Sequence, residues 1–211
     1  MNHNLVWNFS LADATLLKHE FNTVSGNEEK WEKRFFWPAN EKVILMNLGF
    51  DFLNFSHYKF TIHKDCYLPS EQNDNNIKIR KNKCHFKPQI KQVSDCYCYA
   101  KKQKFNLEKL TDWQALALLL PELQKWNQKE PLAEYLKKSL NPVHVYKEAF
   151  IHQFAPKVKL ELSRITINDC HYLSVCIESK MQYDTERLAS LILPNDTSTN
   201  YINFLKSRWI T

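Results

Sequence analysis

The sequence predicts an α+β fold in which helices surround one antiparallel β-sheet. Most of the chain alternates apolar and polar residues with a period of two, which is typical of strands that bury one face. A few stretches break this alternation and show the apolar spacing of helices instead. Segments rich in Asn and Asp separate the strands, and these residues tolerate the left-handed backbone of tight turns.

Eight segments are predicted to be strands because they combine period-two alternation with β-branched and aromatic residues. In chain order they are Trp31–Trp37, Lys59–Tyr67, Ile77–Ile79, Cys84–Ile90, Val93–Lys101, Val143–Phe154, Val158–Ile167 and His171–Ser179. The segment Glu71–Asn76 and the pair Asn168-Asp169 supply turns between them.

The predicted helices lie between and after the strands. They are Asn40–Leu48, Trp113–Leu120 with a continuation through Trp126, Pro131–Leu140, Thr185–Ile192 and Tyr201–Trp209. No repeat, linker or low-complexity tract divides the chain. Residues 1–211 are therefore predicted to form one domain, with a helical insert at about 107–140 between two groups of strands.

The composition limits the classes of function. Only two glycines occur, and the absence of G-x-G-x-x-G and Walker sequences excludes dinucleotide and P-loop chemistry. A net charge of +6 favours anionic partners. The N-terminus lacks the features of a signal peptide, and no apolar run reaches the length of a membrane span, so we expect a cytoplasmic protein. Nothing in the sequence indicates an oligomeric state.

The six cysteines are expected to be reduced thiols in that compartment. Cys96 and Cys98, with Cys84 and His85 nearby, leave a metal-thiolate site as an alternative. Their spacing matches no C-x2-C pair, however, and buried small apolar residues are the simpler interpretation.

The segment I-K-I-R-K-N-K-C-H-F-K, residues 77–87, is predicted to be a hairpin with its turn at Lys81-Asn82 or Asn82-Lys83. Either turn places Ile77, Ile79, Cys84 and Phe86 on one face and Lys78, Arg80, His85 and Lys87 on the other. Like charges that face each other across strands are destabilising. The basic face therefore needs an anionic counterpart, which could be solvent ions, protein carboxylates or a phosphate-bearing ligand.

Other predicted strands also carry one apolar and one ionic face. Glu32 and Arg34 share a face, as do Lys159 and Glu161, and Lys147 lies on one face of its strand between Val145 and Ala149. Two interpretations remain open. The sheet is either packed on one side and solvated on the other, or closed into a barrel whose lumen collects the ionic faces.

Short motifs spread from about Trp31 to Trp209 resemble those of the CYTH family, the triphosphate tunnel metalloenzymes. The matching segments are Glu32-Lys33-Arg34, Asp65-Cys66-Tyr67-Leu68, Ile77-Lys78-Ile79-Arg80, His85-Phe86-Lys87, Val145-Tyr146-Lys147, Leu160–Ile165, Leu173–Glu178 and Asn200–Leu205. The chain resembles a divergent member with a depleted acidic motif: Lys30, Ser163, Ser174 and Cys176 occupy positions where the family pattern has carboxylates.

The resemblance implies an antiparallel eight-stranded β-barrel, or tunnel, with helices packed around it. It also implies that Glu32, Glu161 and Glu178 are the catalytic residues and the ligands of Mg²⁺ or Mn²⁺. The phosphate-binding residues would be Arg34, Lys78, Arg80, His85, Lys87, Lys147 and Lys159. The expected activity is metal-dependent hydrolysis of tripolyphosphate or an organic triphosphate.

Two alternatives accompany this expectation. The first is a non-catalytic protein that binds triphosphate or polyphosphate and has lost the metal site. The second is an RNA-binding module, since Tyr97 and Tyr99 precede the basic segment 101–104 in an aromatic and basic pattern that suits single strands. A turn of solvated lysines is the simpler explanation of that segment. His144 and His152 are expected on packed or solvated strand faces and not as metal ligands.

Overall fold

The computed structural model describes residues 3–12, 28–70, 74–120, 123, 125–126 and 129–209. Its strands are β1 (His3–Asn4), β2 (Phe9–Leu11), β3 (Lys30–Pro38), β4 (Val43–Leu45), β5 (Tyr58–Tyr67), β6 (Asn76–Arg80), β7 (Lys83–Lys87), β8 (Gln89–Val93), β9 (Cys96–Tyr99), β10 (Gln103–Asn106), β11 (Val143–Ala155), β12 (Val158–Ile167) and β13 (Cys170–Ser179). The helices are the 3₁₀ turns η1 (Phe50–Leu53) and η2 (Phe55–His57), and α1 (Leu110–Ala117), α2 (Leu132–Ser139), α3 (Gln182–Ile192) and α4 (Tyr201–Trp209).

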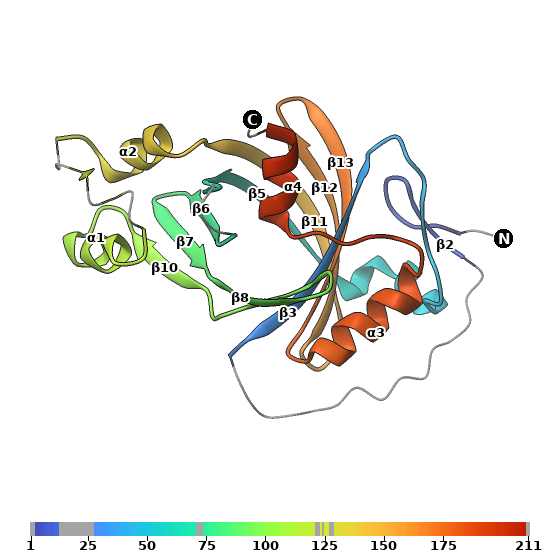
Figure 1. Ribbon diagram of the computed structural model, residues 1–211. Helices are drawn as coiled ribbons and strands as arrows, with labels where there is room; N and C mark the ends of the chain where they lie inside the picture. The colour runs from blue at the N-terminus through green and yellow to red at the C-terminus, as the bar shows by residue number, and fades with distance from the viewer. Residues whose placement is uncertain are drawn as a thin grey trace.

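Ten of the strands form one sheet in the order β10-β7-β6-β5-β11-β12-β13-β3-β9-β8. Every neighbouring pair in this sheet is antiparallel. The long strands β5, β11, β12, β13 and β3 form its centre, and shorter strands extend it on both sides (Figure 1). The predicted antiparallel sheet with helices around it is confirmed.

The connections between short strands force this sheet to curl. Pro88 alone separates β7 from β8, although these strands lie near opposite ends of the strand order. Likewise, only residues 100–102 join β9 to β10. The four residue steps from Tyr99 to Gln103 span at most about 14 Å even in an extended chain. The two ends of the sheet therefore lie close together and the sheet forms a half-barrel. Within the described residues, no ladder between β8 and β10 closes it.

The sheet has ten strands where the sequence predicts eight. Pro88 divides the predicted strand Cys84–Ile90 into β7 and β8, because proline lacks the N–H group that a continuous ladder requires. The tenth strand, β10, pairs with β7 outside every predicted strand.

The helix predicted at Asn40–Leu48 is wrong, because the structure has strand β4 at its centre. β4 runs parallel to β2 in a separate sheet with β1. Val43 and Leu45 are buried, whereas Ile44 is 41% exposed, and this alternation is the period-two signature of a strand. Pairing with β2, which is remote in sequence, therefore determines the conformation of β4 in spite of its weak helical pattern.

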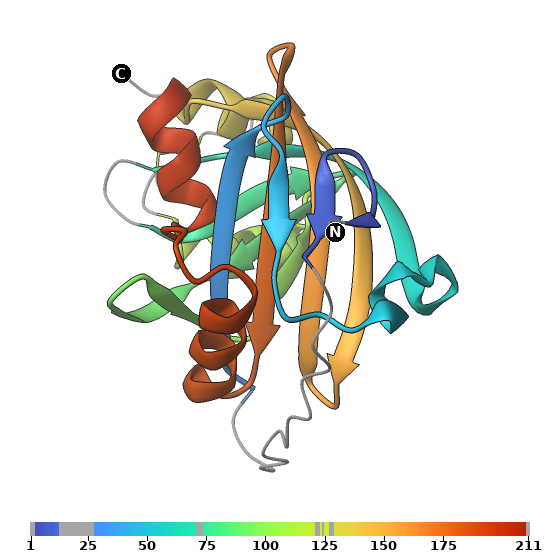
Figure 2. The same cartoon turned by 90° about the vertical axis from the view of Figure 1, so that its right-hand side faces the viewer.

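Helices and the small sheet bury the convex face of the half-barrel. Figure 2 shows β2 and β4 in front of the long strands, where Phe9 and Leu45 share a core with Leu162 and Val175. The helix α3 packs on the same face next to β3 and β13, and both predicted C-terminal helices are present. No helix of the described part of the chain is long and apolar enough to cross a membrane.

Two further clusters lie on either side of the remaining sheet, one outside the β6–β7 hairpin and one on the concave face. The insert helices α1 and α2 cover the apolar face of the β6–β7 hairpin, where Ile77 and Phe86 pack with Leu116 and Leu136. The helix α4 packs through Ile202 and its neighbours on the concave ends of β11 and β12. The remaining concave surface encloses a cavity.

Candidate functional site

The β6–β7 hairpin presents the two faces that the sequence predicts. Its register pairs Ile77 with Phe86 and Lys78 with His85, which places the turn at Lys81-Asn82. Ile77 and Phe86 are buried under the insert helices, whereas Lys78 and His85 line the cavity. The local alternation of the strands therefore delivers a basic face to the concave side.

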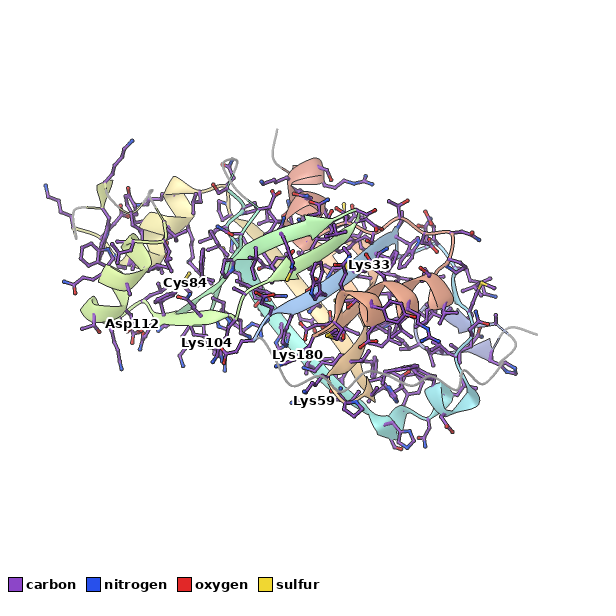
Figure 3. All side chains as sticks on the ribbon, turned by 60° about the horizontal axis from the view of Figure 1, so that its bottom comes forward. Lys33, Lys59, Cys84, Lys104, Asp112 and Lys180 are labelled. Carbon is purple, nitrogen blue, oxygen red and sulfur yellow. The ribbon has the colours of Figure 1, made fainter. Side chains whose placement is uncertain are left out.

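The strand β10 widens this basic face. Lys104 pairs with His85 in the β10–β7 register, so Lys104, His85 and Lys78 form a row across three strands on the cavity side. Figure 3 labels Lys104 and, on the neighbouring strand, Cys84, whose side chain is buried in the opposite direction among the insert helices.

The opposite wall comes from β3, β11, β12 and β13. Alternation on β3 points Glu32 and Arg34 into the cavity, while Phe35 faces the convex core and Lys33, labelled in Figure 3, pairs with Asp95 there. The register of β13 with β3 places Glu178 directly opposite Glu32. Neighbouring carboxylates of this kind repel each other unless cations separate them.

Nine of the ten predicted site residues line a single cavity of about 510 Å³. They are Glu32, Arg34, Lys78, Arg80, His85, Lys87, Lys147, Glu161 and Glu178. The tenth, Lys159, lies outside the lining; its side chain is 44% exposed, and its Nζ is 3.8 Å from Glu178.

A continuous chain of ion pairs crosses the cavity wall. Arg34 Nε donates to Glu32 Oε1 at 3.1 Å, and Arg34 also donates to Glu161 Oε1 at 3.0 Å. Lys87 Nζ donates to Glu32 Oε2 at 2.9 Å, so both oxygens of Glu32 accept from cations. Lys147 Nζ donates to Glu161 Oε1 at 3.0 Å. The predicted phosphate-binding residues therefore neutralise the predicted metal ligands.

The remaining acidic groups near the cavity are paired in the same way. Lys30 donates to Glu178 Oε1 at 2.6 Å, and Lys87 lies 3.9 Å from Glu178 Oε2. Asp65, buried beneath the basic hairpin, accepts two hydrogen bonds from Arg80, at 2.5 and 2.7 Å, and one from Lys78 at 2.8 Å. A bidentate arginine–carboxylate contact of this kind is strong and fixes both groups.

The pKa values of the carboxylates follow from these contacts. Burial alone would raise the pKa of Glu161, but Lys147 and Arg34 outweigh burial and lower its pKa to about 2. Glu32 is equally buried, and Lys87 and Arg34 hold its pKa well below the ordinary value. Both groups are ionised at neutral pH, and their charge is already compensated by protein cations.

This arrangement does not fit a divalent metal ion. Mg²⁺ takes oxygen ligands in near-octahedral geometry and would need carboxylates that converge. Among the residues that the structure describes, no group of three His, Cys, Asp or Glu side chains is placed to hold a metal. The three predicted ligands, Glu32, Glu161 and Glu178, are each held by Lys or Arg instead. The described residues therefore show no Mg²⁺ or Mn²⁺ site.

Positive charge remains in excess around the cavity. Nine Lys and Arg residues line it, against four Glu residues. Lys102 and Lys104 make no ion pair with any described carboxylate. The pKa of Lys102 is lowered by partial desolvation and by the nearby positive charges of Lys104 and Arg80. Burial also lowers the pKa of Lys78 to about 7, although Asp65 is its hydrogen-bond partner. Cations crowded in this way disfavour each other's charge until an anion arrives.

Aromatic rings hold several cations in place without neutralising them. Arg34 lies 5.2 Å from the ring centre of Tyr201 on α4, and Tyr201 stacks on Tyr67 at 4.7 Å. Lys78 lies 4.9 Å from the centre of the Tyr67 ring. A ring face attracts a cation electrostatically but carries no net charge. At the end of the cavity next to α4, ring contacts with Tyr67 and Tyr201 therefore help to position Lys78 and Arg34.

The alternative sites of the sequence analysis receive less support. Tyr97 and Tyr99 are buried, and Tyr99 lies under Lys87, so neither ring is open for stacking on a nucleic acid base. Five of the six cysteines are buried, and Cys170 is exposed. His144 is exposed on β11, and His152 packs against Phe52 on a strand face.

Sequence reasoning missed several lining residues. Lys104 lies on β10, whose four residues Q-K-F-N contain a single apolar side chain and give too weak an alternation to predict a strand. Tyr67 could have been found, because it shares a strand face with Asp65 at a spacing of two. Tyr201 has no local signal, since only the packing of α4 brings it to the cavity.

The comparisons with known proteins found similarity among solved structures alone. No family model matches the chain, and no curated protein matches it. Among solved structures, the chain is similar to HpAC1 from Hippeastrum, whose description reports a dominant triphosphatase activity. The two chains are 11% identical over 84% of this chain and 87% of that chain, with a TM-score of 0.41. We therefore derive the function from the residues of the cavity itself.

Proposed function

We propose that the cavity binds a triphosphate-type polyanion directly on Lys, Arg and His side chains, without a metal ion. The observation that carries this proposal is the charge of the lining, with nine Lys and Arg residues against four Glu residues, each of which is already paired with a cation. A short chain of phosphates carries several negative charges within a few ångströms, which complements the clustered positive charge of the cavity lining. The cavity volume of about 510 Å³ lies within the usual range of small-molecule sites.

The cations divide into two groups with different tasks. Arg34, Lys87 and Lys147 form ion pairs with Glu32 or Glu161, and these pairs fix their positions before a ligand binds. Lys102 and Lys104 have no described carboxylate partner and lie on the side of the basic hairpin. Phosphate oxygens that accept from the second group gain charge-assisted hydrogen bonds without breaking an existing pair. The polyanion would thus lie between the cations that the carboxylates hold and the pair Lys102 and Lys104.

Hydrolysis by a divalent metal would need a different arrangement. A metal ion would have to displace Lys30, Arg34 or Lys87 from the carboxylates that they now neutralise. Breaking buried ion pairs is costly because it leaves charges uncompensated. The geometry therefore favours the non-catalytic binding protein among the functions that the sequence predicts.

The test is a thermal-shift titration with tripolyphosphate in EDTA, repeated with Mg²⁺ or Mn²⁺. We expect stabilisation in EDTA, because a ligand that binds only the native state raises its stability by about 2.7 kcal/mol at one hundred times Kd. For a chain of this size, that gain corresponds to a rise in melting temperature of roughly 5–10 °C. The rise should shrink at high salt, since salt screens the attraction between the charges.

Two variants make the test specific to the cavity. The double variant Lys102→Met with Lys104→Met removes cations that no described carboxylate holds, so the fold should be unaffected. We expect its affinity to fall about tenfold or more, since each hydrogen bond to a charged group contributes about 1.5 kcal/mol or more. Lys42→Met is the matched control, because Lys42 is exposed and lies outside the cavity lining.

Phosphate release is measured in the same samples from neutral to alkaline pH. Absence of stabilisation by tripolyphosphate in every condition contradicts the proposal. Stabilisation that requires Mg²⁺ or Mn²⁺ and is followed by phosphate release would instead support the metal-dependent hydrolase, with the carboxylates freed from their cations.

A further inference from the structure

His85 and Tyr201, which both line the cavity, each have a buried polar atom without a hydrogen-bond partner among the described residues, and the ring of His85 can also take up a proton. His85 on β7 is 8% exposed, and its Nδ1 atom is buried without a hydrogen-bond partner among the described residues. A buried polar atom without a partner costs about 1–3 kcal/mol. The side chain nevertheless lines the cavity, so a ligand in the cavity can reach it.

The charged groups that act most strongly on His85 are all cations. Lys78 and Arg80 face it from β6, Lys104 faces it from β10, and Lys102 approaches from the segment before β10. On its own strand, Lys87 lies two residues away on the same face. Unlike Lys78 and Arg80, which share Asp65, His85 forms no ion pair with a described carboxylate.

This environment keeps the imidazole neutral in the empty protein. Burial and the surrounding cations lower the pKa of His85 to about 4. A neutral imidazole has one N–H donor and one acceptor nitrogen, whereas the protonated ring has two donors. The protonated form is therefore a better partner for phosphate oxygens but is disfavoured until negative charge enters the cavity.

We propose that His85 takes up a proton from solvent when a polyanion binds and donates a hydrogen bond to a phosphate oxygen, so that binding is coupled to protonation. This inference rests on the proposed function and adds a determinant of specificity to it. The step adds one proton to the neutral ring and breaks no other bond. Because four neighbouring cations, Lys78, Arg80, Lys102 and Lys104, oppose this proton, a ligand with several negative charges is needed to compensate for it.

The first experiment counts the protons taken up on binding. Tripolyphosphate is titrated into the protein by calorimetry at pH 7 in EDTA, in two buffers with different ionisation enthalpies. We expect the wild-type protein to take up more protons per bound ligand than His85→Gln, by up to one. The ligand's own protonation is the same in both titrations, so the difference belongs to His85.

The second measurement is the pH dependence of affinity. Between pH 8 and pH 6, the affinity of the wild-type protein should rise by up to about one hundredfold relative to His85→Gln, because uptake of one proton changes the affinity about tenfold for each pH unit. His144→Gln is the matched control, since His144 is exposed and lies outside this cavity. It should behave like the wild-type protein.

The outcomes separate this inference from the proposed function. Binding with equal proton uptake in the wild-type protein and His85→Gln overturns the role of His85 and leaves the binding site intact. Absence of binding in all variants overturns the proposed function instead. If His85→Gln does not fold, the ring resonances of His85 in the wild-type protein are followed by NMR. An unchanged titration with saturating ligand would then contradict the inference.

Discussion

At the scale of single residues, Arg34 shows how this protein uses its charges. Its guanidinium bonds Glu32 and Glu161 and lies on the ring of Tyr201. Sequence analysis predicts Arg34 as a phosphate contact, but most of its donor capacity goes to the protein itself. Arg34 is therefore a built-in counter-ion in the place where the family resemblance implies a metal.

Replacing Arg34 should be costly. In Arg34→Met, Glu32 loses one of its two cations and Glu161 keeps only Lys147. Removing one partner from a buried ion pair costs about 3–5 kcal/mol, which corresponds to a fall in melting temperature of roughly 10 °C for this chain length. Calorimetry or circular dichroism measures this fall.

The matched control is Arg164→Met. Arg164 pairs with Glu148, but its side chain is 45% exposed, and exposed pairs contribute about 0–1 kcal/mol. Equal melting temperatures for Arg34→Met and the wild-type protein would contradict the role of Arg34 as a structural counter-ion.

At the scale of elements, the β6–β7 hairpin was predictable in detail because its information is local. Period-two alternation fixes which side chains share a face, and a short turn fixes which of them are neighbours. The sequence leaves two turn positions open, and the structure selects Lys81-Asn82. In this turn Lys81 has a φ of 54°, in the left-handed region that glycine adopts most readily.

The turn gives a sharp test of the hairpin register. We expect Lys81→Gly to leave stability unchanged or raise it by up to about 1 kcal/mol, because glycine removes the steric cost of the left-handed backbone. Lys83→Gly, the same substitution at an exposed position of β7, should lower stability by about 0.5–1 kcal/mol. Urea denaturation compares the two variants. Equal destabilisation by both would place the turn elsewhere.

The elements that sequence analysis missed are those with little local information. The three residues of β4 acquire their strand conformation from β2, which lies more than 30 positions earlier in the chain. The four residues of β10 depend on β7 in the same way. Short strands are stabilised by their neighbours, so their own residues predict them poorly.

At the scale of the whole molecule, buried ionic groups link stability to acid pH. The folded-state pKa of Glu161 is lowered from 4.5 to about 2, and that of Asp65 is lowered because Arg80 and Lys78 outweigh its burial. As the pH falls from about 4.5 to about 2, the unfolded chain binds more protons than the folded protein. The contribution of these two carboxylates to stability is therefore fully present above about pH 5 and is lost as the pH falls through this window.

The pKa of His85 extends this dependence upward. Because it is lowered from 6.5 to about 4 in the folded protein, the unfolded chain also binds more protons in that interval. We expect the melting temperature of the ligand-free protein to fall continuously from about pH 6.5 to pH 2. Calorimetry across this range tests the expectation, and His85→Gln should flatten only the upper part. A constant melting temperature from pH 6 to pH 2 would contradict it.

The sequence by itself determined the strand pattern, the two faces of the basic hairpin and the identity of half of the residues that line the cavity, because alternation along a strand is a local property. Tertiary structure decided which charges meet. Arg34 and Glu161 are 127 positions apart, and Lys30 and Glu178 are 148 positions apart, so their pairing depends on strand order and on the curl of the sheet. Those non-local contacts join the predicted metal ligands Glu161 and Glu178 to cations, Arg34 and Lys30, from a distant part of the chain. The chemistry of the cavity follows from that pairing, which no local pattern encodes.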